Sequence, residues 1–164
     1  MIVLVNDANI LIDLLKLDLL APFFQLPCQF HVTDLAAGEI LEENVDELNR
    51  YIEGGTLLKR SFEFEELLEI RRIQDAHGGL SFPDCSSVFL ATELSATLLT
   101  GDAVLRRAAE KHGIRVHGML WVFEELVGQS ILSKSIAHKK LARLMQINPR
   151  LPVRECRKRL NAWR

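Results

Sequence analysis

The stretch "LVNDANILIDLL" (Leu4–Leu15) decides the fold class of this chain, because two apolar periodicities meet within it. Its start continues the apolar run "MIVLV", which predicts a short buried strand. The apolar spacing of "NILIDLLKLDLL", which follows, predicts one helix. Asp7 stands where the first pattern gives way to the second. The stretch therefore predicts a strand that passes directly into a helix, with a carboxylate at the junction.

The same order of strand and helix recurs along the chain. Further short strands are expected at "CQFHVT", "TLLKRS", "ATLLT" and "IRVHG", each followed by a segment with helical spacing. Such alternation is typical of an α/β fold, so we predict a three-layer sandwich with a mainly parallel central sheet over residues 1–128. Residues 129–164 are expected to form a helical C-terminal extension.

The composition fits one folded domain in a reducing compartment. A chain of 164 residues with 48% apolar side chains is long enough to bury a substantial core. Its three cysteines lie far apart and show no paired spacing, which predicts no disulfide framework and no thiolate metal site. No apolar run reaches membrane-spanning length, and the N-terminus lacks the pattern of a secretory signal. We therefore expect a cytoplasmic protein with no membrane partner.

Charge is distributed unevenly, although the net charge is only −2. Residues 131–164 hold ten of the 20 Lys and Arg residues but only one of the 22 acidic residues, Glu155. Such a basic segment predicts contact with nucleic acid, or with an acidic surface of the protein itself or of a second subunit. The residues expected to contact nucleic-acid phosphates are Lys139, Lys140, Arg143 and Arg154. We favour a tail that packs on the acidic body or on a partner subunit and leaves some of these charges at the rim of a cleft.

Four acidic residues are candidates for a functional site: Asp7, Glu39, Asp84 and Asp102. Each also has an ordinary structural explanation. Asp7 and Asp102 follow predicted strands and can cap helices, and Asp84 stands three residues after Ser81, as in a capping box. Glu39 falls within the helix expected after the second strand and can be a surface carboxylate.

Taken together, the four acids predict a metal site. In a parallel sheet all turns from strand to helix lie along one edge, where ligands bind, so Asp7 and Asp102 are expected to be neighbours. Two carboxylates about 4 Å apart repel by roughly 4 kcal/mol at an effective dielectric constant near 20, so either some of the acids stay protonated or a cation lies among them. Oxygen ligands without His or Cys favour Mg²⁺ or Mn²⁺, which can activate water for phosphodiester hydrolysis. Asn9 and Thr100 are expected to support the acids, although turn chemistry and strand propensity explain them equally well.

Over residues 1–127 the sequence resembles the PIN-domain ribonucleases, particularly the small toxins of toxin–antitoxin pairs. The resemblance rests on the order and spacing of four motifs, "VNDANILIDL", "HVTDLAAGEI", "LSFPDCSSVFLATEL" and "LLTGD". These place Asp7, Glu39, Asp84 and Asp102 at the family's four acidic positions, as metal ligands and catalytic residues. The resemblance implies a metal-dependent endonuclease for single-stranded RNA, often a homodimer, that a cognate antitoxin protein inhibits.

The sequence departs from the family pattern at several points. The segment "AVLRR" after Asp102 lacks the further acid or polar residue of many relatives, Pro83 beside Asp84 is less usual, and Asp34 replaces a small or apolar residue. The basic extension also lies outside the core pattern. A different class of function therefore stays open: a non-catalytic PIN-like protein that binds RNA or a protein partner. A receiver domain and a D-x-D phosphatase are disfavoured, because neither motif is complete.

Overall fold

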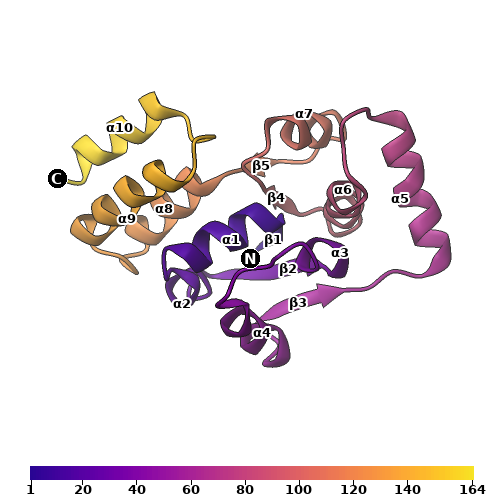
Figure 1. Ribbon diagram of the computed structural model, residues 1–164, viewed down its shortest axis with the longest axis horizontal. Coiled ribbons are helices and arrows are strands. Elements are labelled where there is room, and N and C mark those ends of the chain that lie inside the picture. Colours follow the sequence, from indigo (N-terminus) through magenta and orange to yellow (C-terminus); the bar gives the residue numbers. More distant parts are fainter.

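The computed structural model describes residues 1–164 and has a five-stranded parallel sheet at its centre (Figure 1). The sheet order is β3-β2-β1-β4-β5, and all four neighbouring pairs are parallel. The strands are β1 (Ile2–Asn6), β2 (Cys28–Thr33), β3 (Leu57–Arg60), β4 (Thr97–Leu99) and β5 (Val116–His117). Because every strand runs in the same direction, all five end at one edge of the sheet.

The sheet order reverses between β1 and β4, next to the first predicted acid. The chain adds β2 and β3 on one side of β1 and then returns to add β4 and β5 on the other. Asn6 pairs with Leu99, and the backbone N–H of Asp7 donates to the carbonyl of Leu99 at 2.9 Å. Such a reversal leaves a crevice at the carboxyl ends of the strands, where ligands bind in open α/β sheets.

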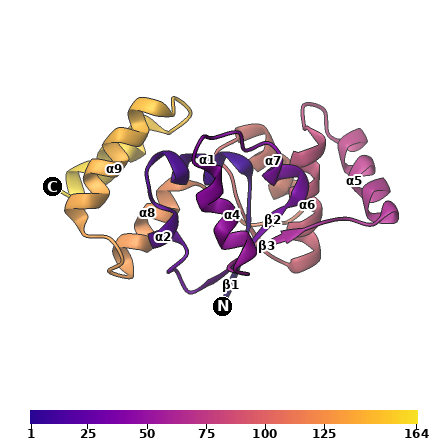
Figure 2. The ribbon, with the colours of Figure 1, turned by 60° about the horizontal axis from the view of Figure 1, so that its bottom comes forward.

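Helices cover both faces of the sheet, as expected for a three-layer sandwich (Figure 2). They are α1 (Ala8–Lys16), α2 (Leu20–Phe23), α3 (Asp34–Ala37), α4 (Val45–Glu53), α5 (Phe64–Ala76), α6 (Phe82–Leu94), α7 (Ala103–Lys111), α8 (Met119–Gly128), α9 (Lys134–Ile147) and α10 (Val153–Ala162). Successive strand residues serve opposite faces: Leu4 and Leu99 pack with α1, α2 and α8, whereas Val5 and Leu98 pack with α6 and α7. The predicted α/β sandwich is confirmed.

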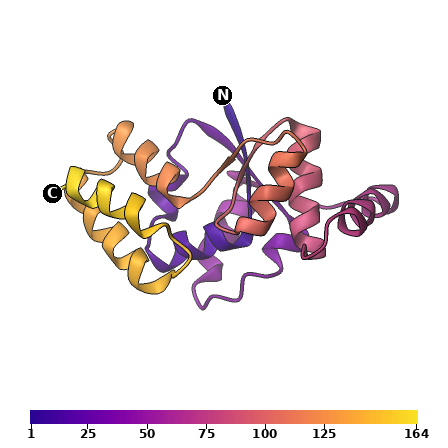
Figure 3. The ribbon, with the colours of Figure 1, turned by 90° about the horizontal axis from the view of Figure 1, so that it is seen from above.

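The C-terminal extension consists of α9 and α10, which lie beside α8 at one end of the molecule (Figure 3). It shares its apolar core with the body. Its buried residues in the cluster that contains α1, α2 and α8 are Leu132, Ala137, Leu141, Leu144, Cys156 and Trp163. At the opposite end of the molecule, α5 projects outward and packs mainly on α6 (Figure 1).

Two predicted helices differ from the structure. The helix expected over "NILIDLLKLDLL" ends at Lys16, and Asp18 adopts a left-handed conformation, with φ of 55°. Asp tolerates this conformation, and the turn lets Leu17, Leu19 and Leu20 all enter the core, which a straight helix would not allow. Glu39 was expected inside a helix, but α3 ends at Ala37 and Glu39 lies in the following turn. There Gly38 weakens the helix, and the chain turns so that Ile40 can be buried.

The remaining predicted elements agree with the structure. The strands at "CQFHVT" and "TLLKRS" correspond to β2 and β3, and the helix expected to end at Gly54 does so. No helix combines the length and the apolar character needed to cross a membrane.

Candidate active site

Asp7 lies where the strand order reverses, in the turn from β1 to α1. Only 5% of the residue is exposed. Its Oδ1 accepts a hydrogen bond from the N–H of Ala8 at 2.8 Å, as the N-cap of α1. Its Oδ2 accepts from the hydroxyl of Thr100 at 2.7 Å and from Nδ2 of Asn9 at 3.1 Å. Both carboxylate oxygens of Asp7 are therefore held in place by hydrogen-bond donors.

The electrostatic environment of Asp7 opposes its negative charge. The pKa of its carboxyl is raised from the ordinary value of 3.8 to about 6, mainly by burial and in addition by the charges of Asp84 and Glu39. The hydrogen bonds from Thr100 and Ala8 act in the opposite direction and lower this pKa. A cation beside Asp7 would relieve both the desolvation and the repulsion, so this location favours a positively charged ligand.

Asp84 and Glu39 approach Asp7 from different elements. Asp84 lies in the first turn of α6, where its Oδ2 accepts from the N–H of Ser81 at 3.0 Å. In return, its own N–H donates to the Ser81 hydroxyl at 3.1 Å, which completes the predicted capping box. Glu39 is largely exposed, and its pKa is raised by partial desolvation of the carboxyl and by the charge of Asp84. The structure thus brings three of the four acids into one region of negative potential.

Asp102 lies in the corresponding turn after β4 and caps α7. Its Oδ1 accepts from the N–H groups of Val104 at 2.8 Å and Leu105 at 3.2 Å. Its backbone N–H donates to the hydroxyl oxygen of Thr100 at 3.1 Å, so Thr100 links the turns that carry Asp7 and Asp102. Asp102 is not among the charges that raise the pKa of Asp7. Its carboxylate therefore belongs to the helix cap more than to the group around Asp7.

Asn9 and Thr100, the two residues expected to support the acids, both contact Asp7. Asn9 donates to Asp7 and accepts at Oδ1 from the N–H of Gly101 at 3.1 Å. Thr100 is fully buried. Both side chains therefore connect the start of α1 to the turn after β4, and together they fix the orientation of the Asp7 carboxylate.

The oxygen donors around Asp7 suit a hydrated Mg²⁺ or Mn²⁺ ion. No three His, Cys, Asp or Glu side chains stand close enough to enclose a metal ion together, and Asp84 and Asp102 each use one oxygen in a helix cap. Mg²⁺ is commonly held by one or two carboxylates and keeps several of its waters. A site centred on Asp7, with Asp84 and Glu39 nearby, fits such an ion. An ion stripped of water and enclosed by all four carboxylates does not fit.

The four basic residues expected to contact RNA differ in their surroundings. Lys140 extends to the body, where its Nζ donates to the carbonyl of Leu17 at 2.7 Å. Lys139, Arg143 and Arg154 are exposed and form no ion pair within the chain. The extension thus packs on the body, as we favoured, and leaves three of the four cations free for an external ligand.

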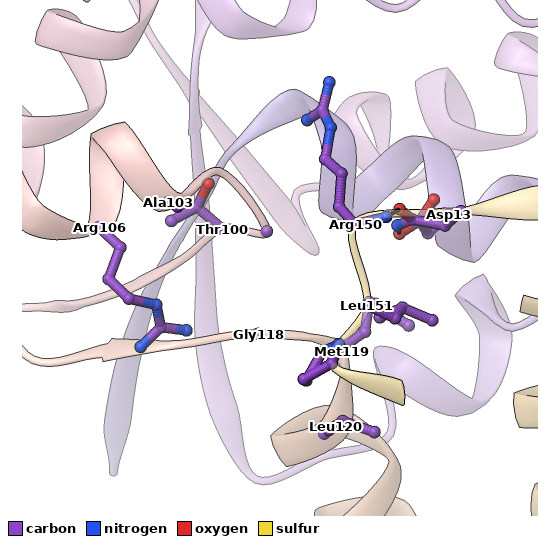
Figure 4. A pocket seen from close by; sticks show the side chains of 12 residues that line it. Asp13, Thr100, Ala103, Arg106, Gly118, Met119, Leu120, Arg150 and Leu151 are labelled. Carbon is purple, nitrogen blue, oxygen red and sulfur yellow. Dashed lines mark hydrogen bonds between the residues drawn. The ribbon is translucent and has the colours of Figure 1, made fainter. Parts of the chain in front are cut away.

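A hollow of about 330 Å³ lies beside this site, between the turn after β4 and the loop 148–152 that joins α9 to α10 (Figure 4). Its lining includes Asp13, which the sequence reasoning did not single out. Asp13 is only 8% exposed, and burial raises its pKa, whereas Asn148, Lys16 and Arg150 lower it. The signal was present in "NILIDLL", where Asp13 is the one acid within the apolar pattern of a helix.

These features define a class of protein: a parallel α/β sandwich with a buried carboxylate at the point of strand-order reversal and further acids around it. The chain belongs to the PIN-domain family, since the family model described as PIN domain, DUF3368, matches residues 3–164. The match includes the C-terminal extension. The PIN domain is generally a nuclease fold, and PIN domains typically bind divalent metal ions. No curated protein matches the sequence.

Proposed function

We propose that this PIN-domain protein is a metal-dependent endoribonuclease that hydrolyses phosphodiester bonds of single-stranded RNA. The observation that carries the proposal is the environment of Asp7. This carboxylate is buried where the strand order reverses, held by Thr100 and Asn9, and placed within the repulsive field of Asp84 and Glu39. Strongly perturbed carboxyls in a crevice are typical of functional sites, and this one favours a cation.

In this proposal Asp7, Asp84 and Glu39 hold Mg²⁺ or Mn²⁺. The ion, when bound, supplies positive charge and Lewis acidity for hydrolysis of the phosphodiester. Thr100 and Asn9 both donate to Oδ2 of Asp7 and fix the direction of its carboxylate, as residues that hold metal ligands do in other proteins. Asp102 holds the turn that carries Thr100, and its Oδ2 accepts no hydrogen bond from the chain, so it is available as a fourth acceptor.

The exposed cations of the extension provide a surface for the RNA backbone. Lys139, Arg143 and Arg154 are proposed to contact phosphates, together with the part of Lys140 that is not used against the body. Binding through such contacts weakens steeply as salt concentration rises.

We further assign the protein the role of a toxin in a toxin–antitoxin pair, acting as a homodimer that a cognate antitoxin inhibits. The order and spacing of the four acidic motifs support the toxin role. Phe64 and Leu68 support the homodimer, since they lie one turn apart on the projecting helix α5 and are 69% and 46% exposed. Light scattering of the wild type and of Phe64→Ser tests the dimer. The wild type is expected to be a dimer, and Phe64→Ser is expected to weaken it.

Cleavage of a fluorescent single-stranded RNA oligonucleotide tests the enzymatic role. The wild type is expected to cut the RNA with Mg²⁺ or Mn²⁺ and to stop when a chelator is added. Asp7→Asn should lower the rate by roughly a hundredfold or more, because the variant loses the charge that attracts the ion. Asp18→Asn, an exposed acid just beyond the same helix, is the matched control and should keep the wild-type rate.

Expression in a bacterial host tests the toxin role with the same two variants. Wild type and Asp18→Asn should arrest growth, whereas Asp7→Asn should not. Equal cutting rates for the wild type and Asp7→Asn, or cutting that a chelator leaves unchanged, would contradict the enzymatic proposal.

A non-catalytic RNA-binding protein is the second candidate. It is favoured by the helix caps, which occupy one oxygen each of Asp84 and Asp102, and by the lack of any three acids that enclose an ion. Under this alternative the wild type binds RNA equally well with and without a divalent metal ion, and no cleavage follows.

A further inference from the structure

The hollow beside the site is continuous with the contacts that hold Asp7. Thr100 and Gly101 line it, and these residues donate hydrogen bonds to Asp7 and Asn9 respectively. A second hollow of about 310 Å³ adjoins the first, and its lining includes Asn9, Asp13 and Gly101. An RNA strand that runs through these two hollows toward Asp7 passes over Asp13.

Asp13 presents a hydrogen-bond acceptor to both hollows. Its Oδ2 accepts from Nδ2 of Asn148 at 2.9 Å, and its Oδ1 accepts no hydrogen bond from the chain. Asn148 is itself fixed, because its Oδ1 accepts from the N–H of Arg150 at 2.9 Å. The residue is nine-tenths buried, and its Oδ1, which is not used within the chain, is a strong acceptor that a bound N–H donor can use.

The rest of the lining suits a nucleotide. Met119 and Leu151 form an apolar edge, and Arg106 and Arg150 lie on opposite sides of the hollow (Figure 4). Apolar side chains can cover the face of a base, and guanidinium groups pair well with phosphate. A volume of about 330 Å³ lies at the lower end of the range for small-molecule sites, which is roughly 300–1,000 Å³.

We infer that this hollow is a subsite for one nucleotide of the RNA strand, in which Asp13 reads the base and prefers one with an amino group over uracil. Cytosine, adenine and guanine each offer amino N–H donors to the free Oδ1. Uracil offers one ring N–H between two carbonyl oxygens, and these oxygens face the negative charge of the carboxylate. Specific recognition of single-stranded RNA commonly uses the edge of an unstacked base in this way.

The position of Asp13 on α1 determines how far from the cut bond the preferred base lies. Asp7 caps α1 and Asp13 is six residues further on, which corresponds to about 9 Å along the helix axis. The base that Asp13 reads therefore lies within a few nucleotides of the bond that is cut. The inference rests on the proposed function only in taking single-stranded RNA as the ligand.

Binding of oligocytidine and oligouridine tests the inference separately from cleavage. The two bases are both pyrimidines of the same size, and cytosine has the amino group that uracil lacks. Fluorescence anisotropy on full-length Asp7→Asn in Mg²⁺ should show about tenfold tighter binding of oligocytidine, as a good hydrogen-bond contact to a base provides. In Asp7→Asn with Asp13→Asn the preference for oligocytidine should be lost, because the amide oxygen still accepts from Asn148 and the amide nitrogen that replaces Oδ1 donates to a uracil carbonyl.

Two matched variants on the same Asp7→Asn background separate base reading from structural effects. Asp18→Asn removes an exposed charge just beyond α1, and His138→Ala removes the contact between its Nδ1 and the carbonyl of Leu160, which ties α9 to α10. Both should keep the preference for cytosine, and Asp13→Asn should still accept from Asn148 and keep its thermal unfolding temperature within a few degrees.

Three outcomes would overturn the inference: equal binding of the two oligonucleotides, a preference that survives Asp13→Asn, or no binding of either. Loss of the preference in His138→Ala as well as Asp13→Asn would also overturn it, because packing of the extension would then explain the effect. If the preference depends on Asp13 but the wild type cuts no RNA, the subsite stands and the nuclease proposal fails.

Discussion

The turns after β1 and β4 look alike in sequence, yet the structure gives their acids different surroundings. Each turn places an Asp directly after a buried strand and before a helix, and both Asp7 and Asp102 are N-caps. Asp7 lies at the centre of the sheet and receives hydrogen bonds from two side chains, Thr100 and Asn9. Asp102 uses its Oδ1 on two N–H groups of its own helix. An acid at the end of a strand can therefore serve simply as a helix cap. Burial beside other acids is what raises its pKa and favours a cation next to it.

Among substitutions in the two turns, removing the charge of Asp7 is expected to change the free energy of unfolding most. Its pKa of about 6 in the folded protein exceeds the ordinary 3.8, so between these values the folded state holds a proton that the unfolded chain has lost. This contribution to stability is complete below pH 3.8 and is lost as the pH rises to about 6. The difference between the two pKa values corresponds to about 3 kcal/mol.

Asp7→Asn is therefore expected to be more stable than the wild type at pH 7 without metal, by up to about 3 kcal/mol, and to lose this advantage near pH 4. Urea unfolding of both proteins in chelator at the two pH values measures the difference. Asp102→Asn in the same experiment should show no such gain at pH 7. An Asp7→Asn variant that is less stable than wild type by the same amount at both pH values would refute the assigned environment.

Thr100→Val tests the link between the two turns. The substitution removes the donor to Asp7 and the acceptor for the N–H of Asp102, so we expect a loss of about 1–3 kcal/mol of unfolding free energy. Because the hydroxyl lowers the pKa of Asp7, that pKa should rise above about 6. Carbon NMR of the Asp7 carboxyl measures the shift. Thr97→Val, three residues earlier on β4, is the matched control and should leave the titration of Asp7 unchanged.

Asp102→Ala is expected to have the smallest effect of the three. The loss of an N-cap costs about 1 kcal/mol, because two N–H groups at the start of α7 lose their acceptor. Thermal unfolding should show this loss, and Asp102→Ser, which restores a capping oxygen, should recover most of it. If Asp102→Ala instead abolished RNA cleavage as completely as Asp7→Asn, the two acids would be equally important for catalysis. The difference in their surroundings would then not predict their catalytic roles.

Local patterns were sufficient to predict most of the fold. The capping box of Ser81 and Asp84 and the caps at Asp7 and Asp102 depend on a few neighbouring residues, and each is present in the structure. The helix expected around Glu39 was wrong because burial of Ile40 bends the chain after Ala37. That outcome depends on what packs around the turn, which a local pattern does not contain.

At the candidate site, Asp13 also shows that a local sequence pattern does not predict contacts between distant segments. Its position within an apolar helix was visible, but its role depends on Asn148, which is 135 residues away in the sequence. The contact exists only because the extension folds back across α1. A hollow between two such segments cannot be predicted from the sequence of either segment alone.

The sequence by itself determined the alternation of strand and helix, the acids at the strand ends and the basic character of the extension, because these follow from the order of neighbouring residues. Only the tertiary structure decided that Asp7 is buried among like charges while Asp102 remains a cap, and that the extension closes a hollow over Asp13. The physical reason is that desolvation and charge repulsion depend on distances through space between segments remote in the chain.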